Sequence, residues 1–262
     1  MPDRALTLVV LFVVSLFFIC MGAPRFVQNG LEDIYFRLYA SADRAYALGE
    51  KHFNATDADQ YDVRRAQRFF RIAATMDPQH PVVHHELARI DFLNGYFISA
   101  LARINFQIQQ HGSTVPNSYY IRGLIEGYIG EYTLAALDYE RYLQFDPTNW
   151  AANNDLAWVL LKAGRLHDAL EAIDRGLTYF PTNPWLLNSR AIALYELGEY
   201  DEAGVSARKA SVEVEKLKAE DWLRAYPGND PRVAAEGIAA FTKAVQDNMH
   251  RIEVQLKESN VQ

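Results

Sequence analysis

Two short stretches decide the fold of this chain: AGRLHDA at residues 163–169 and LGEYDEA at residues 197–203, which begin 34 residues apart. In each stretch a glycine is followed five residues later by an alanine. The alanine recurs along the chain at Ala66, Ala100, Ala135, Ala169 and Ala203. The glycine recurs at Gly95, Gly130, Gly164 and Gly198, and a proline closes the unit at Pro78, Pro147 and Pro181. A fixed period of about 34 residues predicts a solenoid of stacked helix pairs.

This pattern resembles the tetratricopeptide repeat (TPR) family, closely over residues 116–182 and well from about residue 81 to 210. In the family's frame, the first helix of each pair (helix A) carries a small residue at Ala88, Gly123, Ala157 and Ala191. The alanine series is the small position of the second helix (helix B). An aromatic or apolar residue follows each turn glycine, at Phe97, Tyr132, Leu166 and Tyr200. The resemblance implies an all-α fold, a right-handed α-solenoid of TPR helix pairs.

Elementary physics agrees with this fold. Neither helix of a pair can bury its apolar stripe alone, so the pairs must stack, and small residues let their backbones approach closely. Glycine supplies the left-handed conformation that ends helix A, and Asp-Pro at residues 77–78 and 146–147 ends helix B. We expect residues 25–80 to form an N-terminal cap and a degenerate first repeat, with one helix from about Leu31 to Phe53. Residues 81–217 should form four TPR repeats.

The N-terminal segment is apolar on every face. Residues 5–24 contain no charged side chain, and about 20 residues at about 1.5 Å each span a bilayer core. We interpret residues 1–24 as an uncleaved, single-pass membrane anchor. The alternatives are a cleaved signal peptide, which has a poor cleavage site at Ala23, and a lipoprotein signal at Cys20. Basic residues flank both sides almost equally, and the short N-terminal tail favours an extracytoplasmic (periplasmic) repeat domain.

The C-terminal residues 218–262 are predicted to form capping helices. Residues 211–226 read as continuous helix, and PGNDP at residues 227–231 breaks it. A final helix from Arg232 to about Glu258 places one apolar stripe at three- and four-residue steps. The stripe consists of Ile238, Phe241, Val245, Met249, Ile252 and Leu256. Solenoids need such a cap over their exposed end, and self-association through the stripe is the alternative.

Composition and motifs argue against several classes of function. The net charge is −7 without a basic run, which argues against nucleic-acid binding. His84, His85 and Glu86 lack the histidine spacing of a zinc protease, because Arg89 stands at the required position, and His80 supplies no third ligand. No phosphate loop or nucleophile motif occurs in the sequence. We therefore expect neither a metal, a cofactor nor an enzymatic activity.

The TPR resemblance implies that helix A lines a concave groove. At its groove positions the chain lacks the Lys, Asn and Arg pattern of the carboxylate clamp that binds chaperone C-termini. Aromatic and amide side chains dominate instead, and both types suit an extended peptide. Trp158 and Trp185 fit either the groove or the core between repeats. The predicted partner-binding groove consists of Arg89, Phe92, Tyr120, Tyr128, Asn154, Trp158, Asn188 and Tyr195.

Taken together, these features predict a membrane-anchored TPR scaffold. Its groove would bind a peptide or helix of a partner protein, and the layout is typical of an assembly or accessory factor of a membrane or envelope complex. A secreted or lipid-anchored periplasmic TPR protein, and a structural homo-oligomer built through the last helix, are the alternatives.

Overall fold

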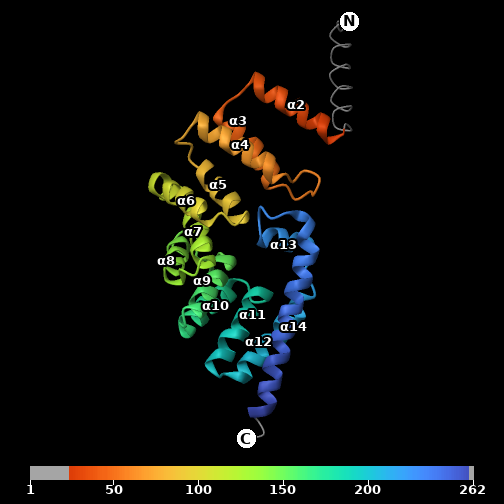
Figure 1. Cartoon of the computed structure of the whole chain (residues 1–262). Coiled ribbons are helices and arrows are strands. Elements are labelled where there is room, and N and C mark those ends of the chain that lie inside the picture. The colour runs from red at the N-terminus through yellow and green to blue at the C-terminus, as the bar shows by residue number, and fades with distance from the viewer. Residues whose placement is uncertain (1–23, 260–262) are drawn as a thin grey trace, which may run out of the picture.

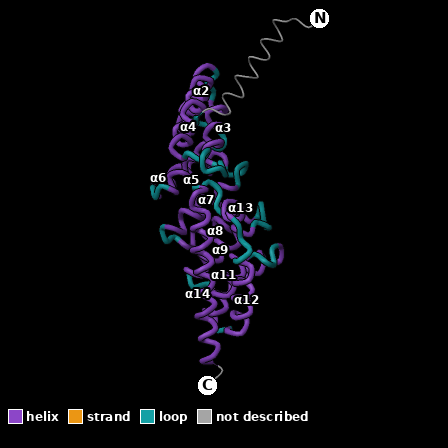
Figure 2. The backbone as a smooth tube through the Cα atoms, turned by 90° about the vertical axis from the view of Figure 1, so that its right-hand side faces the viewer, coloured by secondary structure: helices purple, strands orange, loops and turns teal. Residues whose placement is uncertain are grey.

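Stacked helix pairs make up most of the molecule (Figures 1 and 2). The computed structural model describes residues 24–259, and this part of the chain contains no strand. The pairs are α3 (Ala42–Phe53) with α4 (Val63–Met76), α5 (Val83–Leu93) with α6 (Phe97–His111), α7 (Asn117–Tyr128) with α8 (Tyr132–Leu143), α9 (Trp150–Lys162) with α10 (Leu166–Tyr179), and α11 (Pro184–Leu197) with α12 (Tyr200–Val214). Helix α2 (Arg25–Leu38) precedes the pairs, and α13 (Ala219–Ala225), a 3₁₀ turn (Pro231–Val233) and α14 (Ala234–Ser259) follow them.

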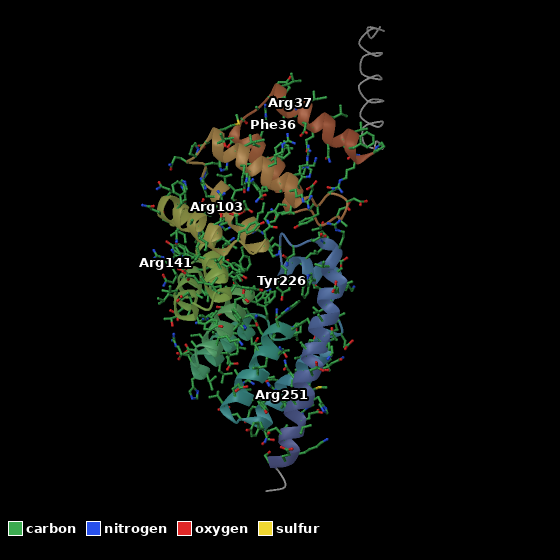
Figure 3. All side chains as sticks on the ribbon, viewed as in Figure 1. Phe36, Arg37, Arg103, Arg141, Tyr226 and Arg251 are labelled. Atoms are coloured by element: carbon green, nitrogen blue, oxygen red, sulfur yellow. The ribbon has the colours of Figure 1, made fainter. Side chains whose placement is uncertain are left out.

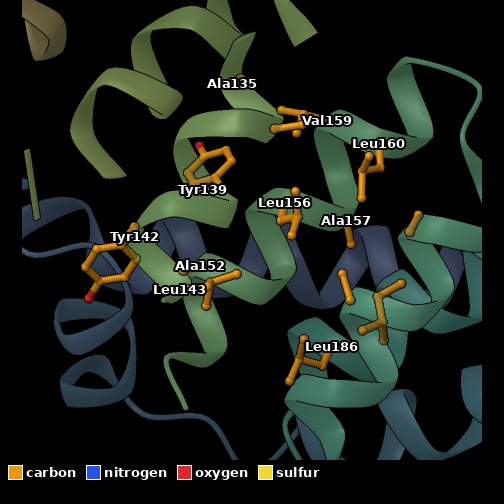
Figure 4. Close-up of a cluster of buried hydrophobic side chains, with 14 of the residues drawn as sticks. Ala135, Tyr139, Tyr142, Leu143, Ala152, Leu156, Ala157, Val159, Leu160 and Leu186 are labelled. Carbon is orange, nitrogen blue, oxygen red and sulfur yellow. The ribbon is translucent and has the colours of Figure 1, made fainter. Parts of the chain in front are cut away.

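The small residues of the repeat lie where the helices touch. All five alanines of the helix-B series are fully buried, as are the helix-A residues Ala88, Ala157 and Ala191. At Gly123 an added Cβ would lie 3.2 Å from the carbonyl oxygen of Ala135, so the two helices meet there almost backbone to backbone. Around these contacts the larger side chains of α7 to α11 form one continuous cluster (Figure 4). The predicted solenoid is thus confirmed at the level of its contacts.

The turn glycines have the backbone that the sequence demanded. Gly95, Gly130, Gly164 and Gly198 have φ values of 75°, 90°, 75° and 81°, in the left-handed region that favours glycine. Each stands between helix A and helix B of one pair. Among the described residues no other residue type has a positive φ.

The N-terminal helix that we expected from Leu31 to Phe53 is two helices, because the chain breaks at residues 39–41. Ser41 starts α3 by accepting a hydrogen bond from the backbone N–H of Arg44 at 3.2 Å. Helix α3 then packs on α4 as a helix pair of its own. The prediction missed the break because serine is also tolerated inside a helix.

Helix α2 is attached to this first pair by charged groups. The guanidinium of Arg65 in α4 donates to Glu32 at 2.9 Å and to Asp33 at 2.7 Å. Hydrogen bonds from His52, Lys51 and Arg65 outweigh burial and hold the pKa of Glu32 down at about 2. Phe36 is the buried apolar contact of α2, edge to face with Phe69.

The expected continuous helix over residues 211–226 is also interrupted. Helix α12 ends at Val214, and α13 begins at Ala219 after a turn. Leu217 packs against the buried cluster that includes Val214 and Val245, which draws the turn inward. The side chain of Asp221 then accepts a hydrogen bond from the backbone N–H of Lys218 at 2.9 Å and starts α13. Tertiary burial of one leucine thus overrides a helical sequence pattern.

Helix α14 lies along α12 and α11, against the last pair (Figure 1). Ile252 and Val245 are buried against these helices. Phe241 stacks on Trp185, with ring centroids 5.1 Å apart and planes 6° from parallel. The apolar stripe is therefore used inside the chain.

The loop between α13 and α14 reaches back to the first repeats. The carbonyl of Gly228 accepts a hydrogen bond from the Tyr61 hydroxyl at 2.9 Å, and that of Pro227 accepts one from Arg89 at 2.8 Å. Gly228 has φ 86°, and an added Cβ would lie 2.9 Å from the ring of Phe53. The C-terminal segment (residues 215–259) thus connects the last repeat with the first.

No helix in the described part of the chain combines the length and the apolar composition needed to cross a membrane. The predicted anchor, residues 1–24, lies outside the described residues except for Pro24. It stays a prediction.

The buried alanine contacts predict a size limit. Ala169→Leu places three extra carbons where the side chain is fully buried, and should lower the free energy of unfolding by about 1–3 kcal/mol. Ala244→Leu, the same change at an exposed position of α14, is the control and should be close to neutral. Thermal and urea denaturation measure both. Equal melting curves for the two variants would mean that Ala169 is not a close helix contact.

Candidate functional site

The A helices α5, α7, α9 and α11 line the side of the stack that faces the C-terminal segment (Figure 1). This is the concave side of the curved stack, and the B helices α6, α8 and α10 lie on its outer side, whereas α12 packs against α14 (Figure 1). In the C-terminal segment, Tyr226 and Arg251 lie on the side that faces the repeats (Figure 3). The predicted groove residues therefore face the chain's own C-terminal segment, and the segment covers some of them and not others.

An aromatic row runs across three repeats on this face. Phe92 of α5 lies 5.0 Å from Tyr128 of α7, and Tyr128 lies 6.2 Å from Trp158 of α9, measured between ring centroids. Phe97 and Tyr132, the first residues of α6 and α8, extend the row at 5.9 Å from Phe92 and 6.1 Å from Trp158. Tyr128 is 64% exposed and Trp158 is 36% exposed, so the middle of the row is open to solvent.

Gly127 explains how neighbouring repeats bring these rings together. A Cβ at Gly127 would lie 3.0 Å from Cζ3 of Trp158, so the indole lies directly on the backbone of α7. Any larger residue at Gly127 would push the indole away from Tyr128. In the local sequence Gly127-Tyr128, the glycine therefore leaves space for the indole of Trp158 in the next repeat, and Tyr128 supplies the ring that contacts this indole.

Asp155 lies beside this row, one helical turn before Trp158. Its carboxylate accepts a hydrogen bond from the Tyr120 hydroxyl at 2.7 Å, and the Asn154 amide lies at 3.5 Å. The Asn154 oxygen in turn accepts from the Ser189 hydroxyl at 2.8 Å. Burial raises the pKa of Asp155 to about 6, although the hydrogen bonds from Tyr120 and Asn154 act to lower it.

The C-terminal segment covers the two ends of the predicted groove. Asn248 of α14 donates to the Asn188 oxygen at 3.1 Å, and the guanidinium of Arg251 lies 4.5 Å from the ring centroid of Tyr195. At the other end, Arg89 pairs with Glu86 at 2.7 Å and also donates to the loop at Pro227. These three predicted residues already have partners within the chain.

The structure thus sorts the eight predicted groove residues into three groups. Phe92, Tyr128 and Trp158 come together in the aromatic row, and Tyr120 and Asn154 meet at Asp155. Arg89, Asn188 and Tyr195 contact the C-terminal segment. Of the two tryptophans left open, Trp158 is partly exposed in the aromatic row, and Trp185 is buried against Phe241.

Sequence reasoning missed Asp155, whose helix, WAANNDLAWVLLK, has no other acidic residue. That isolation was the available signal, because a charge amid small and apolar residues on an A helix has to face the groove or a partner. The contacts of Asn248 and Arg251 carried no such signal, since both residues belong to an ordinary amphipathic helix.

The histidine-rich stretch of α5 is part of the packing. His85 is buried, contacts the Ser118 hydroxyl at 3.1 Å, and burial lowers its pKa to about 3. Burial raises the pKa of Glu86 to about 7, against the opposing charge of Arg89. Within residues 24–259, no group of three or more His, Cys, Asp or Glu side chains is arranged to hold a metal ion.

Comparisons with known proteins agree with this architecture. A family model described as tetratricopeptide repeat matches residues 120–184 and 154–212. A crystal structure of MamA is 22% identical, with a TM-score of 0.54, and the match covers 58% of this chain and 89% of that one. MamA from Desulfovibrio magneticus RS-1 is 14% identical, with a TM-score of 0.55, and the match covers 66% and 93%.

YrrB, described as a TPR protein with an unusual peptide-binding site, is 12% identical, with a TM-score of 0.56, and the match covers 79% of this chain and 97% of that one. No curated protein sequence gives a significant match. At these identities the likeness to solved structures shows the fold. The chain is an all-α repeat solenoid of the TPR type, as the sequence pattern predicted.

The raised pKa of Asp155 predicts a pH-dependent stability. The carboxyl has its ordinary pKa of 3.8 when unfolded and about 6 when folded. The folded state therefore binds more protons between these values, and the free energy of unfolding falls as the pH rises through this window. Asp155→Asn removes the titration and keeps an oxygen that accepts from Tyr120. Between about pH 5 and pH 7.5, wild type should lose about 1 kcal/mol relative to this variant.

Urea denaturation at the two pH values measures the difference. Tyr139 and Tyr226 also face Asp155, and they titrate far above this range. Other groups, Glu86 included, titrate in both proteins and cancel. A constant stability difference between wild type and variant would show that Asp155 titrates normally.

Proposed function

We propose that this chain is a membrane-anchored TPR scaffold that binds a peptide or helix of a partner protein on the open middle part of its concave face. The observation that carries the proposal is the aromatic row, exposed at Tyr128 and Trp158 between the two regions that the C-terminal segment covers. Aromatic side chains are enriched in protein interfaces because they bring a large contact area at low entropic cost. An adaptor that recruits a partner suits such a face better than a catalyst does.

The groove residues have different parts in this proposal. Phe92, Tyr128 and Trp158 form the contact surface, and Tyr120 and Asn154 shape the polar edge of that surface. Arg89, Asn188 and Tyr195 hold the C-terminal segment, which limits the partner to the space between the two covered ends. The similarity in fold to YrrB, which is described as having a peptide-binding site, is consistent with this use of the concave face.

Loss of the exposed rings should weaken partner binding strongly and spare the fold. Tyr128→Ala together with Trp158→Ala should weaken binding by about 2 kcal/mol or more, roughly 30-fold. A photo-cross-linking amino acid at position 128, introduced into cells with native membranes, should capture one discrete partner. Capture should be lost with Trp158→Ala and unchanged with Tyr179→Ala, which removes an exposed ring from the outer helix α10.

Circular dichroism and melting temperature of each variant serve as the folding control. Capture that survives Trp158→Ala, or that is equally strong from position 179, would place the binding site elsewhere.

Membrane attachment is the second part of the proposal. The uncharged run of residues 5–24 ends directly before α2. The outer face of α2 exposes apolar side chains, while its charged inner face is neutralised by Arg65 and Lys51. The exposed residues are Phe26, Leu31, Ile34, Tyr35, Leu38 and Tyr39. An amphipathic helix of this kind is suited to lie on the lipid surface beside an anchor.

A short N-terminal tail that stays inside would place the repeats on the extracytoplasmic side, where the chain would act as an assembly or accessory factor of a membrane or envelope complex. A secreted or lipid-anchored form is the alternative. Self-association through the α14 stripe is disfavoured, since Val245 and Ile252 are already buried within the chain.

An uncleaved anchor predicts that the protein stays in the membrane fraction after a carbonate wash. N-terminal sequencing of the mature protein should find the original N-terminus. Replacing Leu11 and Val14 with arginine should release the protein into the soluble fraction, because charges at the centre of a span are costly. A mature N-terminus at or beyond Cys20 would instead establish the cleaved or lipid-anchored form.

A further inference from the structure

Asp155 differs from the acidic side chains that are buried in the repeats. Every one of those has an arginine partner. The pairs are Arg89–Glu86 at 2.7 Å, Arg103–Asp91 at 2.7 Å, Arg122–Asp138 at 2.5 Å and Arg122–Glu126 at 3.7 Å. No Arg, Lys or His of residues 24–259 forms an ion pair with Asp155, whose polar partners are Tyr120 and Asn154. A partly buried carboxylate without a cation is costly for the folded chain.

The carboxylate lies among aromatic rings. Burial, and after it the charges of Asp155 and Tyr128, raise the pKa of the Tyr226 phenol, so α13 brings this ring close to both. Burial and the charge of Asp155 likewise raise the pKa of Tyr120 far above its usual range. The Tyr120 phenol of α7 donates to the carboxylate at 2.7 Å, and the phenol at the end of α13 interacts with its charge. On α9 itself, Trp158 follows Asp155 at a spacing of three residues, which places both on one helix face.

Three arginines of the concave side have other partners, and Lys162, exposed at the end of α9, forms no ion pair with Asp155. Arg89 binds Glu86 and the carbonyl of Pro227, and Arg251 stacks on the ring of Tyr195. Arg224 of α13 pairs with Asp221 in the same helix. The outer side offers a contrast: a cavity between α8, α9 and α10 contains Arg165 and Asp168, which already pair with each other at 2.6 Å. The charge of Asp155 is thus left for a group from outside the chain.

A cation fits this place on two counts. Indole and phenol faces attract ammonium and guanidinium groups within about 6 Å of the ring centroid, and a carboxylate adds a charge-assisted hydrogen bond. Tyr128 and Trp158, 6.2 Å apart, are exposed, and Trp158 lies one helical turn after Asp155 on α9. A neutral or acidic group at the same place would leave the carboxylate unpaired or repel it.

We propose that the partner places an arginine or lysine side chain against the exposed rings of Tyr128 and Trp158, and that its cationic head pairs with the carboxylate of Asp155. The proposal rests on the proposed function and adds the chemistry of the partner: a segment that carries a basic side chain among apolar ones. The site is the reverse of a carboxylate clamp, since the repeat supplies the anion and the partner the cation.

The test uses the full chain in detergent micelles and two probes of equal shape. N-acetyl-argininamide is cationic, and N-acetyl-citrullinamide is its neutral counterpart. We expect the indole N–H resonance of Trp158, assigned with Trp158→Phe, to shift and saturate with the arginine probe. The citrulline probe should bind about tenfold more weakly or worse. In Asp155→Asn, which keeps the acceptor for Tyr120, the two probes should bind equally weakly.

Asp168→Asn is the matched control, since it removes an exposed acid from the outer side of the solenoid and should leave the arginine response unchanged. Equal affinities of the two probes for wild type, or an arginine response that survives Asp155→Asn, would overturn the proposal, as would the lack of any shift. If the probes give one of these results but Trp158→Ala still abolishes cross-linking to the partner, the proposed groove function is supported and the cation site is wrong. If cross-linking to the partner is also unchanged in Trp158→Ala, both the groove function and the cation site are wrong.

Discussion

The close approach of helices at small residues is the constraint on which the rest of this structure depends. Ala135 and Gly123 bring α7 and α8 almost into backbone contact, and the same contact recurs with the repeat period at Ala169 and Ala203. Because the side chains at this contact are so small, the helix backbones themselves limit how closely the two helices approach, and this sets the distance between them. Large residues are then free to point to the concave face. At Gly127 the same principle works between repeats, where an absent side chain seats the indole of Trp158. Packing geometry and the candidate binding surface have one physical origin.

A solenoid of this kind has two open ends: α2 packs on the first pair, and the C-terminal segment covers the last pair and also reaches back to the first pairs. Helix α14 covers the last pair through Val245 and Ile252. The loop before it contacts the first pairs through hydrogen bonds between residues 138 and 167 positions apart in the sequence. A nearest-neighbour stack thereby gains contacts between its ends, so its repeats should unfold more cooperatively than those of an open array. The same segment divides the concave face into covered ends and an open middle.

The periodic part of the structure could be predicted from sequence, and the aperiodic part could not. The left-handed turns at Gly130 and Gly164 and the buried Ala169 follow from local chemistry repeated at a fixed spacing. The break before Ser41 depends on a local N-cap and the turn at Leu217 on a tertiary contact; each occurs once, so no repeat marks them. For the candidate site, Phe92, Tyr128 and Trp158 were predicted from their helix-A positions, and the structure brings their rings into one row. The covering of Asn188 by Asn248 depends on a contact 60 positions away and has no local signature.

Asp155 shows how the two kinds of information combine. Its sequence context places a single acid on an otherwise uncharged turn of helix A, and the structure adds that no described cation pairs with it. Folding tolerates this arrangement because Tyr120 donates to the carboxylate and because part of the group can protonate, which limits the cost. An external cation would remove the remaining cost by ionising the carboxyl fully. Binding energy at this position would thus come partly from relief of an unfavourable feature of the free protein. That gain is specific to positively charged partners, because a neutral side chain on the same aromatic rings would leave the carboxyl unchanged.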